Sequence, residues 1–408
     1  MKENTAKFWI GRIHLWLGIS SGLVVFIMAI TGCIYAFQAE IQDMTQPYRF
    51  VEIQQTPVLP PSTLRAIAEE QLPGKHIHAV MYNKPGRAAQ VFFYAYEPEA
   101  YYYGVYLNPY TGQVLKVADL DHNFFGFILD GHFYLWLPDA VGQPVVATAT
   151  LVFVAMLITG LVLWWPKNRK VSKQRFTIKW NARWRRKNYD LHNVLGFYAM
   201  VIGLVLGITG LVWGFQWFAS SLYWTAGGDK TLMYLEPQSD TTQVGQASAV
   251  PIDRVWELMK REHPTAEGIE VHVPETASGP IAANAYPSGD TYWQTDYRYF
   301  DQYSLRELQV DHIYGRFANT AAADKLIRMN YDIHTGAIIG LPGKILMFFA
   351  SLIIASLPIT GFLIWKGRRD KEKSEHRAPA KPGGHAKKKH KSPGVKQKKE
   401  EQAQPVLP

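Results

Sequence analysis

Four long apolar segments constrain the fold of this 408-residue chain more than any other feature. Each one reaches the roughly 20 residues that an α-helix needs to cross about 30 Å of hydrocarbon. Helices buried in soluble proteins are rarely so long and so free of charge, so the pattern predicts four membrane-spanning helices. The segments lie at about Phe8–Phe37, Val145–Trp165, Val194–Phe218 and Ile345–Trp365.

The first apolar segment differs from a cleaved signal peptide. Such a peptide has an apolar core of about 7–15 residues and a small-residue cleavage site. The segment Phe8–Phe37 is longer, and no site of that type follows it. We therefore expect it to remain as a membrane helix.

The positive charge of the chain is concentrated in two segments beside the apolar blocks. The net charge is +9, and residues 166–187 together with those after Trp365 hold 24 of the 43 Lys and Arg residues. An excess of Lys and Arg in loops next to membrane helices marks the cytoplasmic side. Because both clusters adjoin membrane helices, this topology explains them better than nucleic-acid binding, and the clusters could also contact anionic lipid headgroups.

This charge pattern predicts a chain with both termini in the cytoplasm and two regions of about 100 residues on the opposite, periplasmic side. The tail from about Lys371 has no apolar periodicity and is expected to be disordered. The full expected organisation is the N-terminus and first helix at 1–39, a periplasmic module at 40–142, the second helix at 143–165, a basic cytoplasmic loop at 166–188, the third helix at 189–218, a second periplasmic module at 219–340, the fourth helix at 341–365 and the tail at 366–408.

The two halves of the chain repeat the same pattern. Arg12–Gly32 and Tyr189–Gly210 each carry a His near the start, a Leu-Gly pair shortly after it and a closing Ile-Thr-Gly. Ile-Thr-Gly recurs at Ile158–Gly160 and Ile359–Gly361 in the other two helices. Since both halves begin on the same side, we expect two parallel repeats related by a pseudo-twofold axis along the membrane normal.

The two regions between the helices read as small α+β modules. In the first, a helical pattern at Pro61–Leu72 precedes strand patterns rich in aromatic and β-branched residues. The second repeats the order with a helix at Ile252–Arg261 and strands near Gly268–Val273 and Arg298–Phe300. The fold class is therefore a four-helix transmembrane bundle with two α+β modules.

His14 and His192 are the sharpest candidates for a functional site. Ionisable residues at membrane depth are costly and suggest a function, although a single interfacial His can also reach the headgroups. Both residues occupy matching places in the repeat, and each has a glycine four residues later, Gly18 and Gly196. Such glycines leave room for a flat group, and imidazole is a common axial ligand of haem iron.

Two further histidines lie at the opposite end of the helices. His132 and His334 precede Trp165 and Trp365 by about 30 residues, which places them at the outer ends of the second and fourth helices. Residues on opposite membrane faces cannot bind one iron, so His14 pairs with His192 and His132 with His334. His122 and His312 are symmetric reserve candidates for the outer site. The alternative for His132 and His334 is a solvated or helix-capping role.

Several common cofactor signals are absent from the sequence. There is no C-x-x-C-H haem attachment, no G-x-G-x-x-G and no P-loop. The only cysteine, Cys33, excludes an intrachain disulfide and a cysteine-bound iron–sulfur cluster. Any haem would be non-covalent haem b, and the paired histidines predict two of them, with electrons supplied from elsewhere.

These motifs resemble those of the PepSY-associated transmembrane proteins, bacterial inner-membrane proteins tied to iron uptake. The resemblance covers about residues 8–368 and rests on RIHLWLG, NPYTGQVL, DLHNVLG and the DIHTG segment that precedes PGK. It implies a ferric-siderophore reductase with haem ligands at His14, His132, His192 and His334. The partners would be a ferric siderophore outside and a flavoprotein reductase or quinol as electron donor. The second module departs from the pattern, with Ser304-Leu305 in place of Thr-Gly.

Two other readings fit the same family resemblance. PepSY modules are associated with protease inhibition, so the chain could be a non-enzymatic membrane regulator. A permease for the iron chelate is the third reading. Four helices with few buried charges and no broken-helix pattern argue against a permease.

Overall fold

The computed structural model describes residues 5–97, 99–166, 175–246 and 250–377. It separates into two compact units, Met1–Trp365 and Lys366–Pro408. The first unit contains all the candidate site residues. In the second, the last long helix continues to Arg377, and the expected disorder of the remaining tail concerns residues outside those described.

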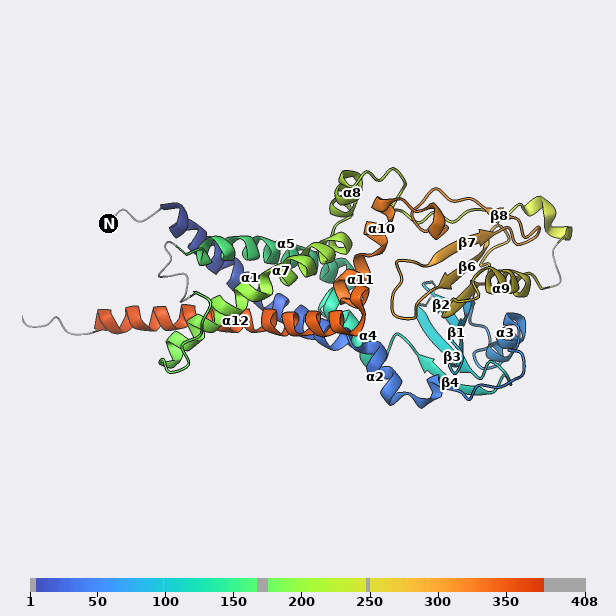
Figure 1. Cartoon of the computed structure of the whole chain (residues 1–408), viewed down its shortest axis with the longest axis horizontal. Helices are drawn as coiled ribbons and strands as arrows, with labels where there is room; N and C mark the ends of the chain where they lie inside the picture. The colour runs from blue at the N-terminus through green and yellow to red at the C-terminus, as the bar shows by residue number, and fades with distance from the viewer. Residues whose placement is uncertain (1–4, 98, 167–174, 247–249, 378–408) are drawn as a thin grey trace, which may run out of the picture. The chain divides into compact units, whose positions relative to one another are not determined.

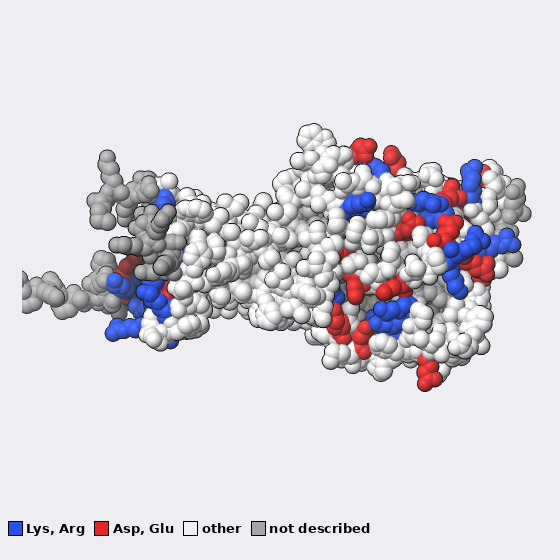
Figure 2. All heavy atoms as spheres, in the orientation of Figure 1, with Lys and Arg blue, Asp and Glu red and all other residues white. Residues whose placement is uncertain are grey.

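Four helices are long and apolar enough to cross a membrane (Figure 1). Only 22–33% of the residues in their most apolar windows are buried inside the protein, so most of the apolar surface faces outward. In Figure 2 the middle of this helical region shows no charged side chains. The predicted set of four spanning helices is confirmed, as α1 (Thr5–Tyr35), α5 (Asp139–Trp164), α7 (Trp184–Gly214) and α12 (Gly340–Arg377).

Small residues let these helices approach one another closely. A Cβ atom on Gly207 of α7 would lie 2.6 Å from the Val154 side chain of α5. On α1, a Cβ atom on Gly22 would lie 3.2 Å from Pro358 of α12. Small residues at such contacts are typical of membrane helices, whose association depends on close packing rather than on exclusion of water.

The strands form one antiparallel sheet in the order β4-β3-β2-β1-β5-β6-β7-β8. Its two halves are the strand sets of the two expected modules (Figure 1). The strands are β1 (Ile77–Asn83), β2 (Ala89–Ala95), β3 (Tyr101–Leu107), β4 (Val114–Asp119), β5 (Gly268–His272), β6 (Ile281–Tyr286), β7 (Asp296–Phe300) and β8 (Glu307–Leu308).

The two modules are not separate in the structure, which differs from the expectation. They meet at the seam between β1 and β5, where Ala79 pairs with His272 and Val80 with Val271. An unpaired edge strand exposes a row of N–H and C=O groups. Pairing the two edges satisfies both rows and produces a single sheet that the repeat pattern alone did not reveal.

One face of the sheet is covered by α3 (Pro61–Glu69) and α9 (Pro251–Glu262). Leu64 and Met259 from these helices are fully buried against the strands, together with Val80, Val91 and Phe300. The continuous core explains why both halves alternate apolar and polar residues along their central strands. The opposite face carries many tyrosines, including Tyr94, Tyr102, Tyr286 and Tyr299.

The histidines expected at the ends of the second and fourth long helices lie instead on short separate helices. His132 is on α4 (Phe124–Tyr134), which Asn123 caps by accepting bonds from the N–H groups of Phe125 and Gly126. His334 is on α11 (Asn330–Thr335). Leu135 after α4 and Gly336 after α11 have left-handed backbone angles, which end each helix before the long one begins.

Two boundaries also differ from those expected. The third long helix begins at Trp184, inside the segment assigned to the basic loop. The fourth continues to Arg377, because residues after Trp365 favour helix and no proline follows until Pro379. The remaining helices are α2 (Gln38–Thr45), η1 (Pro47–Arg49), α8 (Gln216–Thr225), η2 (Thr241–Gln246), η3 (Phe317–Asn319), α10 (Ala322–Arg328) and η4 (Ala337–Ile339).

Candidate functional site

The structure brings His132 and His334 together near the sheet end of the helices. Their ring centroids are 6.1 Å apart, with 69° between the ring planes. We call these two residues the sheet-side pair. We call His14 and His192 the distal pair. On α1, His14 comes 18 residues before Gly32, which lies beside His132, and 18 residues correspond to roughly 27 Å of helix. His14 is therefore far from the sheet-side pair. No ring contact joins the distal pair within the described parts of the chain.

Each of the four histidines uses Nδ1 to contact the threonine of one Ile-Thr-Gly motif. In each case the threonine lies on a different helix from the histidine. The distances are 2.9 Å for His14 to Thr159, 3.2 Å for His132 to Thr31, 2.9 Å for His192 to Thr360 and 2.8 Å for His334 to Thr209.

The helix backbone fixes the direction of these bonds. Each threonine hydroxyl donates its only hydrogen to a carbonyl of the preceding turn, as Thr209 does to Val205 at 2.7 Å. The same holds for Thr31, Thr159 and Thr360. The hydroxyl oxygen must therefore accept the histidine bond, so that Nδ1 carries the proton. Met28 O, 2.9 Å from Nδ1 of His132, requires the same tautomer.

This tautomer leaves a lone pair on Nε2 of every one of the four imidazoles. Among the described residues, Nε2 of these histidines forms no hydrogen bond to the protein. A neutral imidazole whose other nitrogen donates to a fixed acceptor is the usual form of a metal-binding histidine. All four imidazoles therefore have the same tautomer, with the proton on Nδ1 and the lone pair on Nε2.

The glycine of each Ile-Thr-Gly motif lies beside the same histidine ring. A Cβ atom on Gly32 would be 3.1 Å from Cε1 of His132, and one on Gly361 would be 3.3 Å from Cε1 of His192. The matching distances are 3.4 Å at Gly160 and 3.9 Å at Gly210. Threonine and glycine of each motif therefore act together: the first binds the ring and the second leaves room for it.

The sheet-side pair lines a cavity of about 470 Å³. Sites for small molecules and cofactors usually fall between about 300 and 1,000 Å³ and are largely apolar. The cavity fits this description, since its walls come from α1, α5, α7 and α12. Representative lining residues are Val25, Phe133, Phe153, Leu206, Trp213 and Ile354.

Both histidines of the sheet-side pair are held neutral. Burial lowers the pKa of His132. Burial and the adjacent His132 lower the pKa of His334. Neutral rings are required for metal binding, because a protonated Nε2 has no lone pair to donate.

The sheet-side pair and its cavity fit a flat metal-containing cofactor. Both rings line the same cavity, so His132 and His334 are the residues that would hold the metal of such a group. The apolar walls and the glycines beside the rings suit a planar macrocycle better than a hydrated ion.

The open faces of Gly18 and Gly196 are filled by neighbouring helices. A Cβ atom on Gly18 would lie 3.0 Å from the Met156 side chain, and one on Gly196 would lie 3.5 Å from Leu357. These glycines serve helix packing in the structure. The space next to His14 and His192 comes from Gly160 and Gly361 instead.

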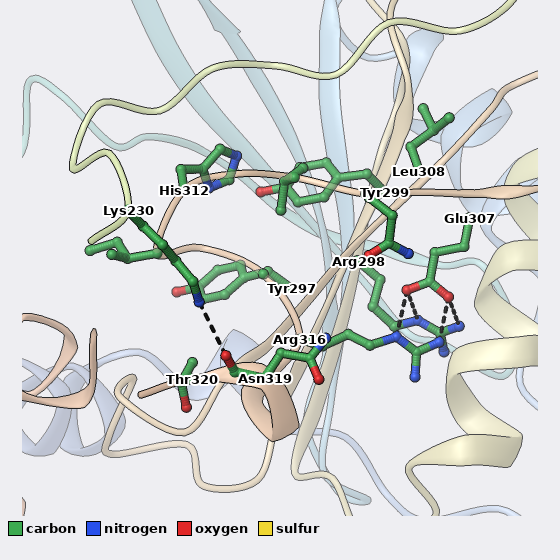
Figure 3. A pocket seen from close by; sticks show the side chains of 14 residues that line it. Lys230, Tyr297, Arg298, Tyr299, Glu307, Leu308, His312, Arg316, Asn319 and Thr320 are labelled. Carbon is green, nitrogen blue, oxygen red and sulfur yellow. Dashed lines mark hydrogen bonds and ion pairs between the residues drawn. The ribbon is translucent and has the colours of Figure 1, made fainter. Parts of the chain in front are cut away.

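The two reserve histidines lie away from the helix bundle. His122 follows β4, is 80% exposed and contacts Asp119. His312 lies in the second half of the sheet region, in a small pocket with Tyr299 and Lys230 (Figure 3). Its Nδ1 accepts a bond from the N–H of Tyr314, so His312 belongs to the packing of this region.

The sequence does not identify the threonines as partners of the histidines. It shows the four Ile-Thr-Gly motifs as a repeat and places each of them in an apolar helix. In α1 and α7, the motif ends 18 residues after the histidine of the same helix. The hydrogen bonds, in contrast, join each of these histidines to the threonine of a motif on another helix. The equal number of candidate histidines and Ile-Thr-Gly motifs, four of each, is the sequence signal that points to these contacts.

The family model for the PepSY-associated TM region matches residues 11–368. No curated protein sequence matches the chain. The residues matched by this model include most of α1, all of α5, α7 and the sheet, and all four histidines. The chain belongs to the family of proteins with a PepSY-associated transmembrane region.

Proposed function

We propose that this multi-pass membrane protein is a haem-b-containing oxidoreductase of the bacterial inner membrane. It would pass electrons across the membrane and reduce a ferric siderophore in the periplasm, which releases the iron. The observation that carries the proposal is the set of four imidazoles with Nδ1 bound to threonine and Nε2 left to bind a metal.

Haem bound at these positions would supply a one-electron carrier. His132 and His334 would hold one haem in the cavity, and His14 with His192 would hold a second near the other membrane face. The threonines fix the tautomer and orientation of each ring. The apolar walls of the cavity would exclude water from the iron of a bound haem and so influence its reduction potential.

The direction of transfer follows from charge. The basic segments at 166–188 and after Trp365 favour the cytoplasm, which assigns the distal pair to that side and the sheet to the periplasm. Electrons would then enter at His14 and His192 from a flavoprotein reductase or quinol. They would leave at the sheet-side pair, where the chelate binds.

Reduction is an effective way to release siderophore iron. Hard oxygen ligands bind Fe(III) much more tightly than Fe(II), so one electron weakens the complex. The protein has to position its carriers and give the chelate access to the outer one. Because the iron leaves after reduction, the iron chelate is a substrate of the proposed reaction and not a resident cofactor.

The test is a single-turnover reaction of the purified full-length protein. The protein would be reduced with dithionite, freed of excess reductant and mixed with a ferric siderophore. We expect rapid return of the oxidised haem spectrum together with ferrous iron, trapped by a coloured chelator. A haem-containing protein that stays reduced would contradict the reductase. A folded, colourless protein would favour the non-enzymatic regulator instead.

A further inference from the structure

The sequence Asn-Tyr-Asp-x-His occurs twice in the chain, and each copy ends at one of the four candidate histidines. The first copy, Asn188–His192, lies near the start of α7, and the second, Asn330–His334, forms most of α11. The asparagine and the histidine of each copy are four residues apart, which places them on the same face of a helix, one turn from each other. The repeat therefore marks one histidine of the distal pair and one of the sheet-side pair.

In both copies, the asparagine and the histidine bind the same threonine of an Ile-Thr-Gly motif. Nδ2 of Asn330 donates to the backbone oxygen of Thr209 at 3.1 Å, and Nδ1 of His334 lies 2.8 Å from the hydroxyl oxygen of the same threonine. The distal copy shows the same two bonds to Thr360, at 3.0 Å from Asn188 and 2.9 Å from His192. A histidine alone leaves its helix free to turn about one bond, whereas a second bond one turn away fixes the rotation and the height of the helix.

Both asparagines are buried, although they are polar. Asn188 is 3% exposed and Asn330 is 6% exposed. Burying an amide is unfavourable unless hydrogen bonds replace those that it made to water. Oδ1 of Asn188 has no hydrogen-bond partner among the described residues, so the bond from Nδ2 is what offsets the burial of this side chain. A polar residue at both positions therefore indicates that the bond to the threonine carbonyl is needed there.

The histidines of the first half of the chain have no such partner. One turn before His14 and His132, the chain has Ile10 and Ile128, whose side chains cannot donate a hydrogen bond. Nδ1 of each of these two rings still contacts its threonine. Each candidate pair therefore combines one histidine whose helix is held to the threonine at two points with one histidine whose ring makes the contact alone.

The aspartate of each copy binds the chain outside the helix bundle. Asp332 is fully buried and accepts bonds from the backbone N–H groups of Tyr292 at 3.0 Å and Trp293 at 2.9 Å, in the connection between β6 and β7. Asp190 is also buried and accepts a 3.3 Å bond from the N–H of Lys179, which precedes α7. Each copy thus connects its histidine to a neighbouring helix on one side and to a loop on the other.

We propose that Asn188 and Asn330 are positioning residues, each of which sets the orientation of one axial imidazole of a haem, an inference that rests on the proposed function. Asn330 acts through His334 at the sheet-side pair, and Asn188 acts through His192 at the distal pair. Because the helix is fixed at two points, the plane of the ring is fixed with it. The partner histidine of each pair, which has no asparagine, is the ligand that adjusts its orientation to the bound haem.

The experiment observes the two haem sites one at a time in the full-length protein. His14→Ala leaves the sheet-side haem and His132→Ala leaves the distal haem, so each background contains one haem. Asn330→Leu removes the donor and nearly preserves the volume of the side chain. In the first background we expect it to lower haem affinity about tenfold or more, the usual effect of losing a partner of a metal-binding histidine. In the second background it should change nothing, and Asn188→Leu should give the reverse pattern.

Electron paramagnetic resonance of the oxidised protein measures the orientation itself. The g-values of a low-spin haem depend on the angle between the planes of its two axial imidazoles. Asn330→Leu should shift the g-values of the sheet-side haem alone, and Asn188→Leu those of the distal haem alone. The matched control is Asn193→Leu, because Asn193 follows His192 directly but donates to Tyr189 O of its own helix. It should leave both signals as in the wild type.

Unchanged g-values and haem affinity in both variants, with two haems in the wild type, would overturn the positioning role and leave the proposed reductase intact. Equal changes at both haems in either variant would overturn it as well, since that result indicates a general loss of packing. Alanine at the two positions removes the donor with less bulk and should show the same selectivity. A wild-type protein without haem would instead refute the proposed function, and the positioning role with it.

Discussion

At the scale of single residues, the site depends on hydrogen bonds whose direction can be deduced. A threonine in a helix has one hydroxyl hydrogen, and in all four motifs a backbone carbonyl of the preceding turn takes it. The imidazole has to donate, which leaves its second nitrogen, Nε2, with a lone pair that could bind a metal. Partners of this kind commonly change metal affinity by about 10–100-fold.

Thr209→Val tests this role at the sheet-side pair. Valine has nearly the same shape but cannot accept the bond from Nδ1 of His334, so we expect haem affinity to fall about tenfold or more. Haem titration of the purified apoprotein would measure the change. The control is Thr150→Val: Thr150 lines the same cavity, but its hydroxyl donates to Val146 O of its own helix, and no hydrogen bond joins it to a histidine among the described residues. Equal losses in both variants would contradict a specific role for Thr209.

Alanine substitutions at the two glycines beside the rings of the sheet-side pair should affect haem binding unequally. A Cβ atom at Gly32 would lie 3.1 Å from His132, closer than ordinary contact, whereas one at Gly210 would lie 3.9 Å from His334. Gly32→Ala should therefore shift the haem spectrum or lower haem content, and Gly210→Ala should change neither. The opposite order would show that the rings are placed differently.

At the scale of elements, most of the fold follows from periodicity. The four long helices, α3, α9 and most strands were expected from apolar spacing and β-branched or aromatic runs, although β6 was not. Two features were beyond such patterns. The β1–β5 seam depends on which edges meet in space, and α4 and α11 depend on left-handed residues such as Leu135, an unusual residue for that conformation.

The candidate site, too, could be predicted from the sequence only in part. The pairing of His132 with His334 could be expected from their matched positions and from the thickness of the membrane. The identity of the hydrogen-bond partners could not, because Thr31 and Thr209 lie about 100 residues or more away in sequence and reach the rings only after the helices pack.

The seam between β1 and β5 should depend on pH, because Nε2 of His272 lies 3.4 Å from a carboxylate oxygen of Glu270 there. Although burial opposes the ionisation of both groups, this contact lowers the pKa of Glu270 and raises that of His272. Glu270 has a lowered pKa, so its stabilising contribution is present above its ordinary value of 4.5 and is lost as pH falls towards about 2. His272 has a raised pKa, so its contribution is complete below its ordinary value of 6.5 and is lost as pH rises through the folded value. Hydrogen exchange of β1 and β5, corrected for intrinsic rates, should show most protection between pH 4.5 and 6.5.

Glu270→Gln should remove most of this pH dependence from the seam. Exchange in α9, which lies on the other face of the sheet, provides the internal reference. A wild-type seam whose protection is the same from pH 4 to pH 8 would show that the ion pair contributes nothing to pairing of the two halves.

At the scale of the whole molecule, membrane orientation tests the proposed direction of electron transfer, because it decides which histidine pair would receive electrons from the cytoplasm. The only cysteine, Cys33, is buried, so single cysteines introduced elsewhere can be labelled selectively. In intact spheroplasts we expect an impermeant maleimide to label Tyr96→Cys, at an exposed position directly after β2. Arg185→Cys should react only after the membrane is opened. The reverse pattern would invert the proposed direction of transfer.

The central claim is that the four imidazoles bind haem in two pairs, and haem content per chain tests it most directly. Protein purified in detergent from haem-replete cells should contain about two haems per chain, with split α and β bands after dithionite reduction. Alanine at His132 or His334 should each leave about one, as should alanine at His14 or His192, while His122→Ala should leave both. A folded wild-type protein without haem, or equal haem content in all five variants, would contradict the account.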